Sequence, residues 1–595
     1  MTTADMVISE VDALLRSSEF LKAYDSARRA LEQFPGFRRL QHRAVLSLAR
    51  AGALERAQAA FKGFGLDTVD DDEDILGLWA RLLKDAAFAL PHEKRGDALR
   101  EASGAYERAH AAGDGGYYSA INVASLLLLA GEHERAADWA RSSETLAADD
   151  QSYYGLATRA EAALVLQDPA RAKTLIGEAV ELGRGDFAAL RSTRRQLQRL
   201  CRYLEIDEAL LGPFAPPRVI HFCGHMPATE DEDGRFPKSE IPRVRSEISE
   251  TLRREDIRFG VGSLAAGSDI LIAEALIASG GSFEAVLPFD RDEFIEVSVA
   301  PFGGEWVARF QTCLAAANTV HYVTEDAWLG DDELFNYASH LGLGLARLWS
   351  DRLGAELAQL AVWDGAPPRT DAGAGTVFDL ARGRGMGVRQ FVIPSRSATP
   401  VSLDALPEFE PHETGSRRRR TMVFGDFKGF SRLSDALLPI YVENVLGTAA
   451  EVLSRYRANL AFRNTWGDGL FLVFDDVTVA ASAALDLCRS LRELDLEALG
   501  LPDTLGLRLG MHYGPVYERR DPVLEQSNFF GFHVSRAARI EPITPEGEIY
   551  VTDAAAAALA VEASDRFRCD YVGQVPLAKG YGAFPMYALT QLDSA

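Results

Sequence analysis

The spacing of apolar residues divides the chain into three regions. Up to about residue 212, apolar residues recur at helical spacing and strand signals are few. From 217 to 395, short apolar runs alternate with helical segments, which predicts βαβ units and a parallel sheet. From 418 to 595, strands, tight turns and helices are mixed. The segment 396–417 is rich in Pro and Ser and has no periodicity, so we expect a linker there.

The helical region repeats one phrase. LARAGALERAQAAF places small residues at Gly52 and Ala57, and LLLAGEHERAADWA places them at Gly131 and Ala136. Small residues at these positions let two antiparallel helices pack closely, and the pattern resembles tetratricopeptide repeats. The alternative is a generic helical bundle. In either case we expect residues 1–212 to recognise a protein partner or to act as a scaffold, without chemistry of their own.

The middle region contains two turns where a strand leads into a helix. At such a turn, exposed backbone amides and the helix dipole favour a phosphate group. The segments SLAAGSDILIAEA, VLPFDRDEF and AVWDGAPPRTDAGAGT make residues 217–395 resemble the SLOG superfamily of Rossmann-like domains. That resemblance implies a sensor for a small nucleotide-derived ligand; the alternative is that the glycines serve close packing. The candidate ligand-binding residues are Gly262, Ser263, Gly267, Ser268, Asp269, Gly375 and Thr376.

Composition narrows the class of protein. The 595 residues carry a formal net charge of −24, which argues against nucleic-acid binding, because phosphate contacts need clustered Lys and Arg. The run Arg417–Arg420 is interpreted as a solvated stretch preceding a strand, the alternative being a site for an anionic partner. Five scattered cysteines suit a reducing cytoplasm. Neither a secretory signal nor a membrane-spanning run is expected.

Two aspartates form the candidate catalytic centre. FRNTWGDGLFLVF predicts a hairpin with Asp468 in its turn, and the apolar run before Asp426 predicts a strand that delivers this carboxylate. If the intervening segment 435–458, expected as one long helix, crosses back over the sheet, the two carboxylates converge. Hard oxygen ligands suit divalent cations, and two carboxylates bridging two cations would clamp a phosphoryl displacement. The turn after Asp426 offers amides for phosphate oxygens, from Phe427, Lys428, Gly429 and Phe430.

Five segments in order resemble the catalytic domain of class III nucleotidyl cyclases: FGDFKGFSRLS, NTWGDGLFLVF, LRLGMHYGPVY, FFGFHVSRAARIEPITPEGEIYVT and LAKGYGAFPMYAL. The resemblance implies a ferredoxin-like α+β domain over 418–595 and two Mg²⁺ or Mn²⁺ ions per site. It implies that Asp426 and Asp468 hold the metals and that Arg508 contacts the substrate phosphates. Lys579 would do the same from the neighbouring chain, while Arg539 would stabilise the transition state.

Three positions depart from the family pattern. Ser535 stands where the family usually has Asn, four residues before Arg539 and therefore on the same helical face. A serine can still donate one hydrogen bond, so the rate is in question but not the reaction. The base-reading positions are Asn464, where the family usually has Lys or Glu, and Asn528, where it usually has Asp or a small polar residue. An amide donates and accepts, so it fits adenine but also uracil or cytosine.

The sequence therefore supports an active cytoplasmic cyclase that converts a nucleoside triphosphate, with ATP preferred, to a 3′,5′-cyclic nucleotide and pyrophosphate under control of the N-terminal domains. Because one chain carries both the metal residues and the Arg539 and Lys579 pair, we expect a homodimer with two equivalent sites. One alternative is a pyrimidine cyclase acting in antiphage signalling. Another is a non-catalytic nucleotide sensor or scaffold in which the cyclase fold has decayed.

Overall fold

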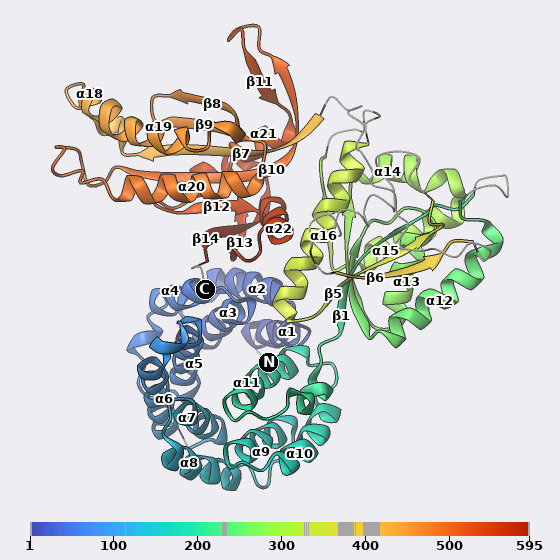
Figure 1. The fold of residues 1–595 in the computed structure, drawn as a ribbon, viewed down its shortest axis with the longest axis vertical. Helices are drawn as coiled ribbons and strands as arrows, with labels where there is room; N and C mark the ends of the chain where they lie inside the picture. Colours follow the sequence, from blue (N-terminus) through green and yellow to red (C-terminus); the bar gives the residue numbers. More distant parts are fainter. Residues whose placement is uncertain are drawn as a thin grey trace. The chain divides into compact units, whose positions relative to one another are not determined.

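The computed structural model describes residues 3–113, 115–228, 235–325, 328, 330, 332–366, 386, 388–396 and 417–592. The chain divides into two compact units, one essentially residues 1–216 and the other the remainder. Figure 1 shows the helices of the first unit and the two sheets of the second. The residues Gly375 and Thr376 lie outside the described part of the chain.

The first unit consists of helical hairpins. Its helices are α1 (Thr3–Arg16), α2 (Phe20–Gln33), α3 (Arg38–Ala51), α4 (Leu54–Gly63), α5 (Glu73–Ala89), α6 (Arg95–Ala112), α7 (Tyr117–Leu129), α8 (His133–Leu146), α9 (Tyr153–Val165), α10 (Pro169–Leu182) and α11 (Phe187–Tyr203). Gly52 ends α3 in the left-handed conformation, which costs glycine nothing, and Ala57 and Ala136 are fully buried. The helical repeats expected from the sequence are confirmed.

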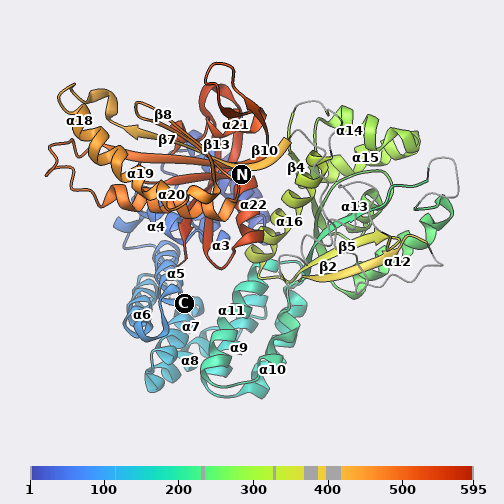
Figure 2. The same ribbon diagram turned by 45° about the horizontal axis from the view of Figure 1, so that its top comes forward.

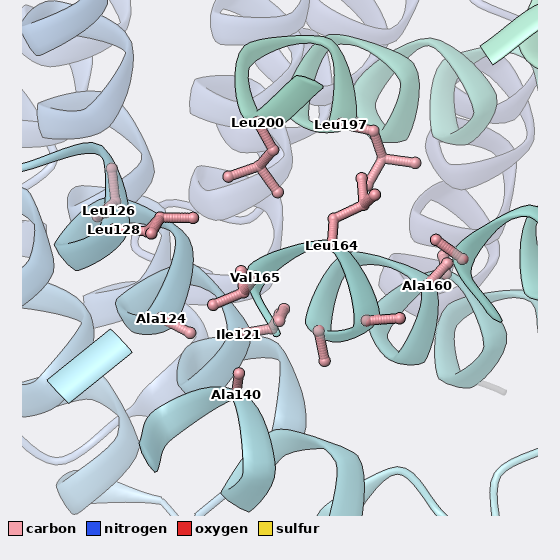
Figure 3. Close-up of a cluster of buried hydrophobic side chains, with 14 of the residues drawn as sticks. Ile121, Ala124, Leu126, Leu128, Ala140, Ala160, Leu164, Val165, Leu197 and Leu200 are labelled. Atoms are coloured by element: carbon pink, nitrogen blue, oxygen red, sulfur yellow. The ribbon is translucent and has the colours of Figure 1, made fainter. Parts of the chain in front are cut away.

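The core of this unit lies between α7, α8, α9 and α11. Leucine side chains of α9 and α11, such as Leu164 and Leu197, project toward one another (Figure 3). Alanines such as Ala140 and Ala160 are fully buried at the same core. Burying apolar surface contributes about 25 cal/mol per Å², so this shared core stabilises neighbouring hairpins together.

The second unit begins with a parallel sheet. Its strands are β1 (Arg218–Gly224), β2 (Ile257–Gly262), β3 (Ser282–Leu287), β4 (Thr319–Tyr322), β5 (Leu357–Trp363) and β6 (Arg389–Pro394), in the order β4-β3-β2-β1-β5-β6. The helices between them are α12 (Ile241–Arg254), α13 (Ser268–Ala278), α14 (Arg291–Ser298), α15 (Gly304–Ala316) and α16 (Glu333–Leu353). The predicted βαβ unit is β2-α13-β3. Strands β2 to β4 are added on one side of β1, whereas β5 and β6 are added on its other side. Open α/β sheets bind ligands at the point where the strand order reverses in this way, here between β1 and β5.

The second sheet of this unit is mixed. Its strands are β7 (Arg417–Lys428), β8 (Leu460–Trp466), β9 (Gly469–Phe474), β10 (Gly506–Arg520), β11 (Ser527–Phe530), β12 (Ile549–Thr552), β13 (Phe567–Pro576) and β14 (Ala583–Gln591). The strand order β10-β7-β9-β8, which ends at one edge of the sheet, has with α19 (Gly447–Ser454) and α20 (Val477–Arg492) the ferredoxin-like arrangement. The remaining helices are α21 (Phe532–Ala537) and α22 (Asp553–Glu562). Figure 2 shows α19 and α20 beside this sheet.

Two local expectations differ from the structure. The segment expected as one long helix is divided into α18 (Leu438–Ile440), a π-helical stretch (Tyr441–Leu446) and α19. The run Arg417–Arg420 does not precede the strand but forms its first part, paired with β10. Ion pairs neutralise two of these arginines, since Arg419 lies 2.8 Å from Glu333 and Arg420 lies 3.2 Å from Asp475.

Candidate active site

The strand register brings the two aspartates together. Asp426 on β7 is opposite Gly469 on β9, so Asp468, one residue earlier in the β8–β9 turn, lies next to it. The backbone N–H of Phe427 donates to the carbonyl of Asp468 at 3.3 Å, which joins the two segments directly. Gly467 starts this turn with φ +72°, a conformation that glycine adopts without strain. The predicted hairpin thus exists and places its turn beside β7.

A cation of the chain itself neutralises this carboxylate pair. Arg508 on β10 is opposite Asp426 in the register and donates from Nη2 and Nε to Asp426 Oδ2, at 2.8 and 3.1 Å. The same guanidinium lies 2.6 Å from Glu541 Oε1. Burial raises the pKa of Asp468, and the charge of Asp426 adds to this increase. The site therefore concentrates negative charge that needs cations.

Two side chains of this site were not identified from the sequence. Burial raises the pKa of Glu541 to about 7; Arg508 opposes the increase, and the nearby Asp426 and Asp468 add to it. Tyr441, in the π-helical stretch, is 1% exposed, and its hydroxyl has no hydrogen-bond partner among the described residues. Burial raises its pKa, with Asp468 and Asp426 contributing. A π-helical turn is frequent at functional sites, but no sequence signal reveals one.

The turn after Asp426 is held by aromatic packing. Gly429 has φ +91°, and a short 3₁₀ turn (Phe430–Arg432) follows. Phe427 and Phe430 both pack on the ring of Tyr441, with centroids 5.6 and 4.9 Å away. Lys428 lies 3.4 Å from Glu546. Only the short 3₁₀ turn follows Asp426, so a phosphate group bound here would be held by the backbone amides of this loop.

A second group of candidate residues lies around Arg539, in the segment that follows α21. The backbone N–H of Ala578 donates to the carbonyl of Arg539 at 3.4 Å, so Lys579 is next to the Arg539 segment. Lys579 has φ +62°, a strained conformation for a residue with a side chain. Arg539 Nε is buried and has no hydrogen-bond partner within the described part of the chain. Ser535, on α21, is exposed.

The two asparagines at the expected base-reading positions lie on two strands that do not pair with each other in the sheet. Asn464 is on β8 and Asn528 on β11, and these strands approach through the edge-to-face rings of Phe462 and Phe529, 6.1 Å apart. The side-chain amide of Asn528 donates to Asp521 at 3.0 Å, while its Oδ1 accepts from the N–H of Phe529. Asn528 is therefore held in one orientation by its own hairpin.

The middle sheet has a cavity of about 350 Å³ at the carboxyl ends of its strands. Of the expected ligand residues, Gly262, Ser263 and Asp269 line it. Burial raises the pKa of Asp269 to about 7, and Asp269 Oδ1 has no hydrogen-bond partner among the described residues. Gly267 and Ser268 do not line the cavity. Gly267 has φ +93° with Pro227 close by, and Ser268 Oγ donates to the carbonyl of His225 at 2.7 Å, so both hold the turn.

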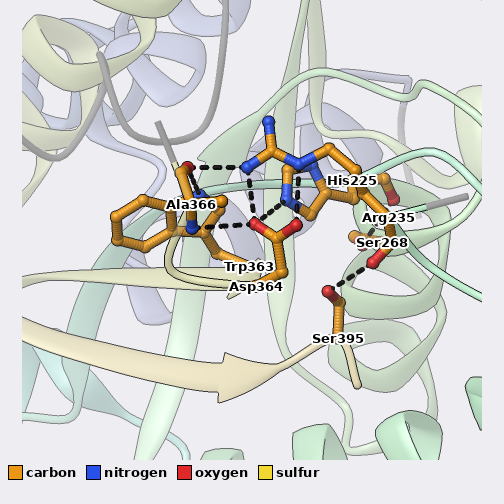
Figure 4. A network of polar contacts seen from close by, with 7 residues as sticks. All are labelled: His225, Arg235, Ser268, Trp363, Asp364, Ala366 and Ser395. Atoms are coloured by element: carbon orange, nitrogen blue, oxygen red, sulfur yellow. Dashed lines mark hydrogen bonds and ion pairs between the residues drawn. The ribbon is translucent and has the colours of Figure 1, made fainter. Parts of the chain in front are cut away.

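A polar network not foreseen from the sequence borders this cavity, where β1 and β5 diverge (Figure 4). Arg235 donates from Nε and Nη2 to the two oxygens of Asp364, at 2.8 and 2.5 Å, and His225 Nε2 lies 3.1 Å from Asp364 Oδ1. These hydrogen bonds outweigh burial and hold the pKa of Asp364 well below its usual range. The network comes from three segments distant in sequence, so no local motif announces it.

Comparison with known proteins identifies the second sheet. Residues 414–591 match the family model of the adenylate and guanylate cyclase catalytic domain. The chain contains a class III nucleotidyl cyclase domain. Residues 19–127 match the model of Tetratricopeptide Repeats-Sensor, which identifies the cyclase's helical repeats as sensor repeats. No curated protein matches the sequence.

Two solved cyclase structures each match part of this chain. The guanylate cyclase domain of RhGC from Catenaria anguillulae, in complex with GTP, is 20% identical, covering 29% of this chain and 97% of its own, with a TM-score of 0.26. The adenylyl cyclase CyaB from P. aeruginosa is 21% identical, covering 30% and 96%, with a TM-score of 0.27. Within the described residues of the cyclase, no helix has the length and apolar character needed to cross a membrane.

The residues present fit divalent metals in their chemistry. Asp426 and Asp468 supply hard oxygen donors on adjacent segments. Their negative charges repel each other, and a bound cation would remove this repulsion. Among the described residues, no group of three or more His, Cys, Asp or Glu side chains is arranged around one metal position. The two aspartates would then be the side-chain ligands, and the remaining ligands would come from backbone, water and substrate.

Proposed function

We propose that the protein converts ATP to 3′,5′-cyclic AMP and pyrophosphate. The observation that carries the proposal is that Asp426, opposite Gly469 in the register of β7 and β9, lies next to Asp468 within the residues 414–591 that match the cyclase family. In the reaction, the ribose 3′-oxygen loses its proton and bonds to the α-phosphorus. The bond from that phosphorus to the oxygen bridging to the β-phosphate breaks, and pyrophosphate leaves with the electron pair.

We expect different side chains of the protein to have different roles in this reaction. Asp426 and Asp468 would hold two Mg²⁺ or Mn²⁺ ions. When bound, the ions would lower the pKa of the ribose 3′-hydroxyl and neutralise the charge of the phosphates. Arg508, which now neutralises Asp426, is positioned to exchange that carboxylate for a substrate phosphate. Arg539 and Lys579 provide a second pair of cations on adjacent segments. We expect them to act on the nucleotide held by the partner chain of a homodimer.

The choice of ATP rests on the amides of Asn464 and Asn528. An amide can accept from the adenine amino group and donate to the neighbouring ring nitrogen. The test is incubation of the purified protein with ATP, GTP, CTP and UTP separately, with Mn²⁺, and identification of cyclic products by mass. We expect cyclic AMP to dominate. Cyclic UMP or CMP as the main product would establish the pyrimidine alternative, and no product from any of the four would favour a decayed scaffold.

We further propose that the middle domain, a SLOG-like sensor, regulates the cyclase through α16. One face of this helix lines the 350 Å³ cavity with Phe335, Ala338 and Ser339. Its opposite face contacts the catalytic domain, because Tyr337 donates its hydroxyl to the backbone carbonyl of Tyr513 at 2.6 Å. Residues at these spacings point to opposite sides of a helix.

The contact reaches two of the elements that carry candidate catalytic residues. Tyr513 is on β10, the strand of Arg508, and the ring of Tyr337 also packs edge-to-face on His533, 5.6 Å away. His533 is in α21, the helix of Ser535. A ligand that shifts α16 would therefore act on β10 and α21 together. A difference of about 1–3 kcal/mol in ligand affinity between two arrangements changes activity about 5- to 150-fold.

A further inference from the structure

The helical repeats enclose a cavity of their own. In Figure 1 the helices from α1 to α10 follow an arc, and α11 lies on its inner side, where it packs against α1, α7 and α9. The cavity between them has a volume of about 510 Å³. Its walls come from several repeats, so no single repeat motif shows it. This volume falls within the range of about 300–1,000 Å³ found for small-molecule sites.

The cavity carries an excess of positive charge in an acidic protein. Six cationic side chains line it, against four carboxylates, while the whole chain has a net charge of −24. The cations are Arg50, Arg81, Lys84, Arg191, Arg195 and Arg199. The carboxylates are Glu73, Asp74, Asp85 and Glu161. Burying cations without matching anions is costly, so their accumulation calls for a reason other than stability.

Two of the four carboxylates already accept hydrogen bonds from neutral side chains. Glu161 accepts hydrogen bonds from Ser125 and Gln196, at 2.5 and 2.9 Å. Glu73 accepts from the hydroxyl of Ser119 at 2.8 Å. The nearest carboxylate to the guanidinium of Arg81 is that of Asp85, 3.8 Å away. Glu161 and Glu73 are thus engaged by neutral side chains rather than by the cations in these hydrogen bonds.

The cationic side chains also disfavour one another's charged form. Burial lowers the pKa of Arg50 to about 10, and neighbouring Arg81 adds to the decrease. Burial likewise lowers the pKa of Lys84 to about 8, and Arg199 and Arg81 contribute against the opposing effect of Asp85. A bound anion would relieve both effects at once.

Two buried polar atoms and two tyrosine rings complete the cavity. The side chain of Gln196 is 6% exposed, yet its Oε1 has no hydrogen-bond partner in the described chain, and the same holds for the buried Nε of Arg50. An unsatisfied buried polar atom costs about 1–3 kcal/mol unless a ligand or water meets it. The rings of Tyr118 and Tyr154 line the same cavity while 49% and 54% exposed.

We propose that this cavity binds a nucleotide, a phosphorylated small molecule with a planar heterocyclic ring. Guanidinium groups match phosphate oxygens in geometry and charge. Exposed aromatic rings offer stacking faces for a base, and Gln196 Oε1 accepts from an amino group on its edge. The repeats would then sense a small molecule directly, in addition to any protein partner. The inference does not depend on the cyclase reaction or on the cavity of the middle domain.

The test is calorimetric titration of the full-length protein in EDTA, where no divalent metal supports nucleotide binding at the aspartates. The probes are AMP, ATP, pyrophosphate and sulfate, with an acidic hexapeptide in parallel. We expect AMP or ATP to bind at micromolar concentrations and to weaken as salt rises. Arg50→Gln and Arg199→Gln should each weaken binding at least about tenfold. Arg184→Gln, which removes an exposed arginine that pairs with Glu181, is the matched control and should leave binding unchanged.

Thermal unfolding without nucleotide separates binding from a structural role. Because Arg50 Nε has no hydrogen-bond partner among the described residues, Arg50→Gln should be as stable as wild type or more so. Three results would overturn the proposal: no binding of AMP or ATP, equal binding by both arginine variants and wild type, or sulfate competing as well as nucleotide. Binding of the peptide alone would assign the cavity to a protein partner instead.

Discussion

Single residues at the catalytic centre owe their properties to their neighbours in space. Asp468 by itself is an ordinary turn residue. It becomes a candidate metal ligand because β9 places it beside Asp426. Arg508 then acts as the counter-charge of that pair. In the proposed mechanism, removing either aspartate removes a metal ligand, and because both side chains are partly exposed we expect the fold to tolerate the loss.

Asp426→Asn and Asp468→Asn should therefore each lower the rate of cyclisation by more than about 100-fold with little change in stability, since even loss of groups behind a metal ligand costs 10- to 100-fold. The measurement is cyclic nucleotide production alongside thermal unfolding. Asp475→Asn, in an exposed position at the end of β9, is the matched control. Undiminished activity in either aspartate variant would refute the two-metal assignment.

Tyr441 provides a stability test at the same scale. Its buried hydroxyl has no hydrogen-bond partner in the described chain, so Tyr441→Phe should leave the free energy of unfolding unchanged or raise it. Tyr456, whose hydroxyl donates to Asp486 at 2.6 Å, is the matched control, and Tyr456→Phe should lose about 1 kcal/mol. Equal losses in chemical denaturation of the two variants would show that Tyr441 has a partner after all.

At the scale of elements, α16 connects a cavity to a catalytic strand. Filling the cavity from this helix with Ser339→Phe should alter the basal cyclase rate, because the larger side chain displaces the helix. Tyr337→Phe, which removes the hydrogen bond to β10, should reduce that effect in the double variant. Arg347→Ala on the same helix, where Arg347 pairs with Asp351, is the control. Rates unaffected by Ser339→Phe would remove α16 from the regulatory route.

A histidine joins β4 to α22 in a pH-dependent manner. Burial alone would lower the pKa of His321, but hydrogen bonds with Asp553 and Glu284 outweigh it and raise the pKa to about 9. The unfolded value is about 6.5. The stabilisation is therefore fully present below about pH 6.5 and disappears as pH rises through about 9.

The thermal midpoint of wild type should accordingly exceed that of His321→Gln at pH 6.5, and the difference should shrink by pH 9.5. Differential scanning calorimetry at several pH values measures this, with His92→Gln, an exposed histidine of the repeats, as the control. A difference independent of pH would show that His321 is neutral in the folded protein. Glu284 is in β3, so the effect concerns the edge of the parallel sheet as well as α22.

At the scale of the whole molecule, the expected active form is a homodimer. Mixing inactive Asp426→Asn chains with inactive Arg539→Ala chains should restore part of the activity, because one of the two sites in the hybrid dimer then keeps every group. Activity is measured after co-expression with two affinity tags, which confirm that heterodimers form. Heterodimers without activity would place the complete site within a single chain.

The sequence by itself determined the periodicities, and through them the three kinds of architecture, the β8–β9 hairpin and the βαβ unit around α13. It also identified Asp426 and Asp468, because ordered cyclase motifs carry them. Local signals suffice for these features, since apolar spacing, glycine turns and motif order are properties of neighbouring residues. The strand register, not the motif, then brought Arg508 onto Asp426.

Tertiary structure alone decided the rest. The π-helical stretch at Tyr441, the network of Arg235 and Asp364, and the two faces of α16 join segments up to about 180 residues apart, as with Tyr337 and Tyr513, which are separated by 176 positions. The cationic cavity of the repeats likewise draws on helices from α2 to α11. Burial, desolvation and unpaired charge arise only when distant segments pack against one another. No local sequence pattern therefore predicts them.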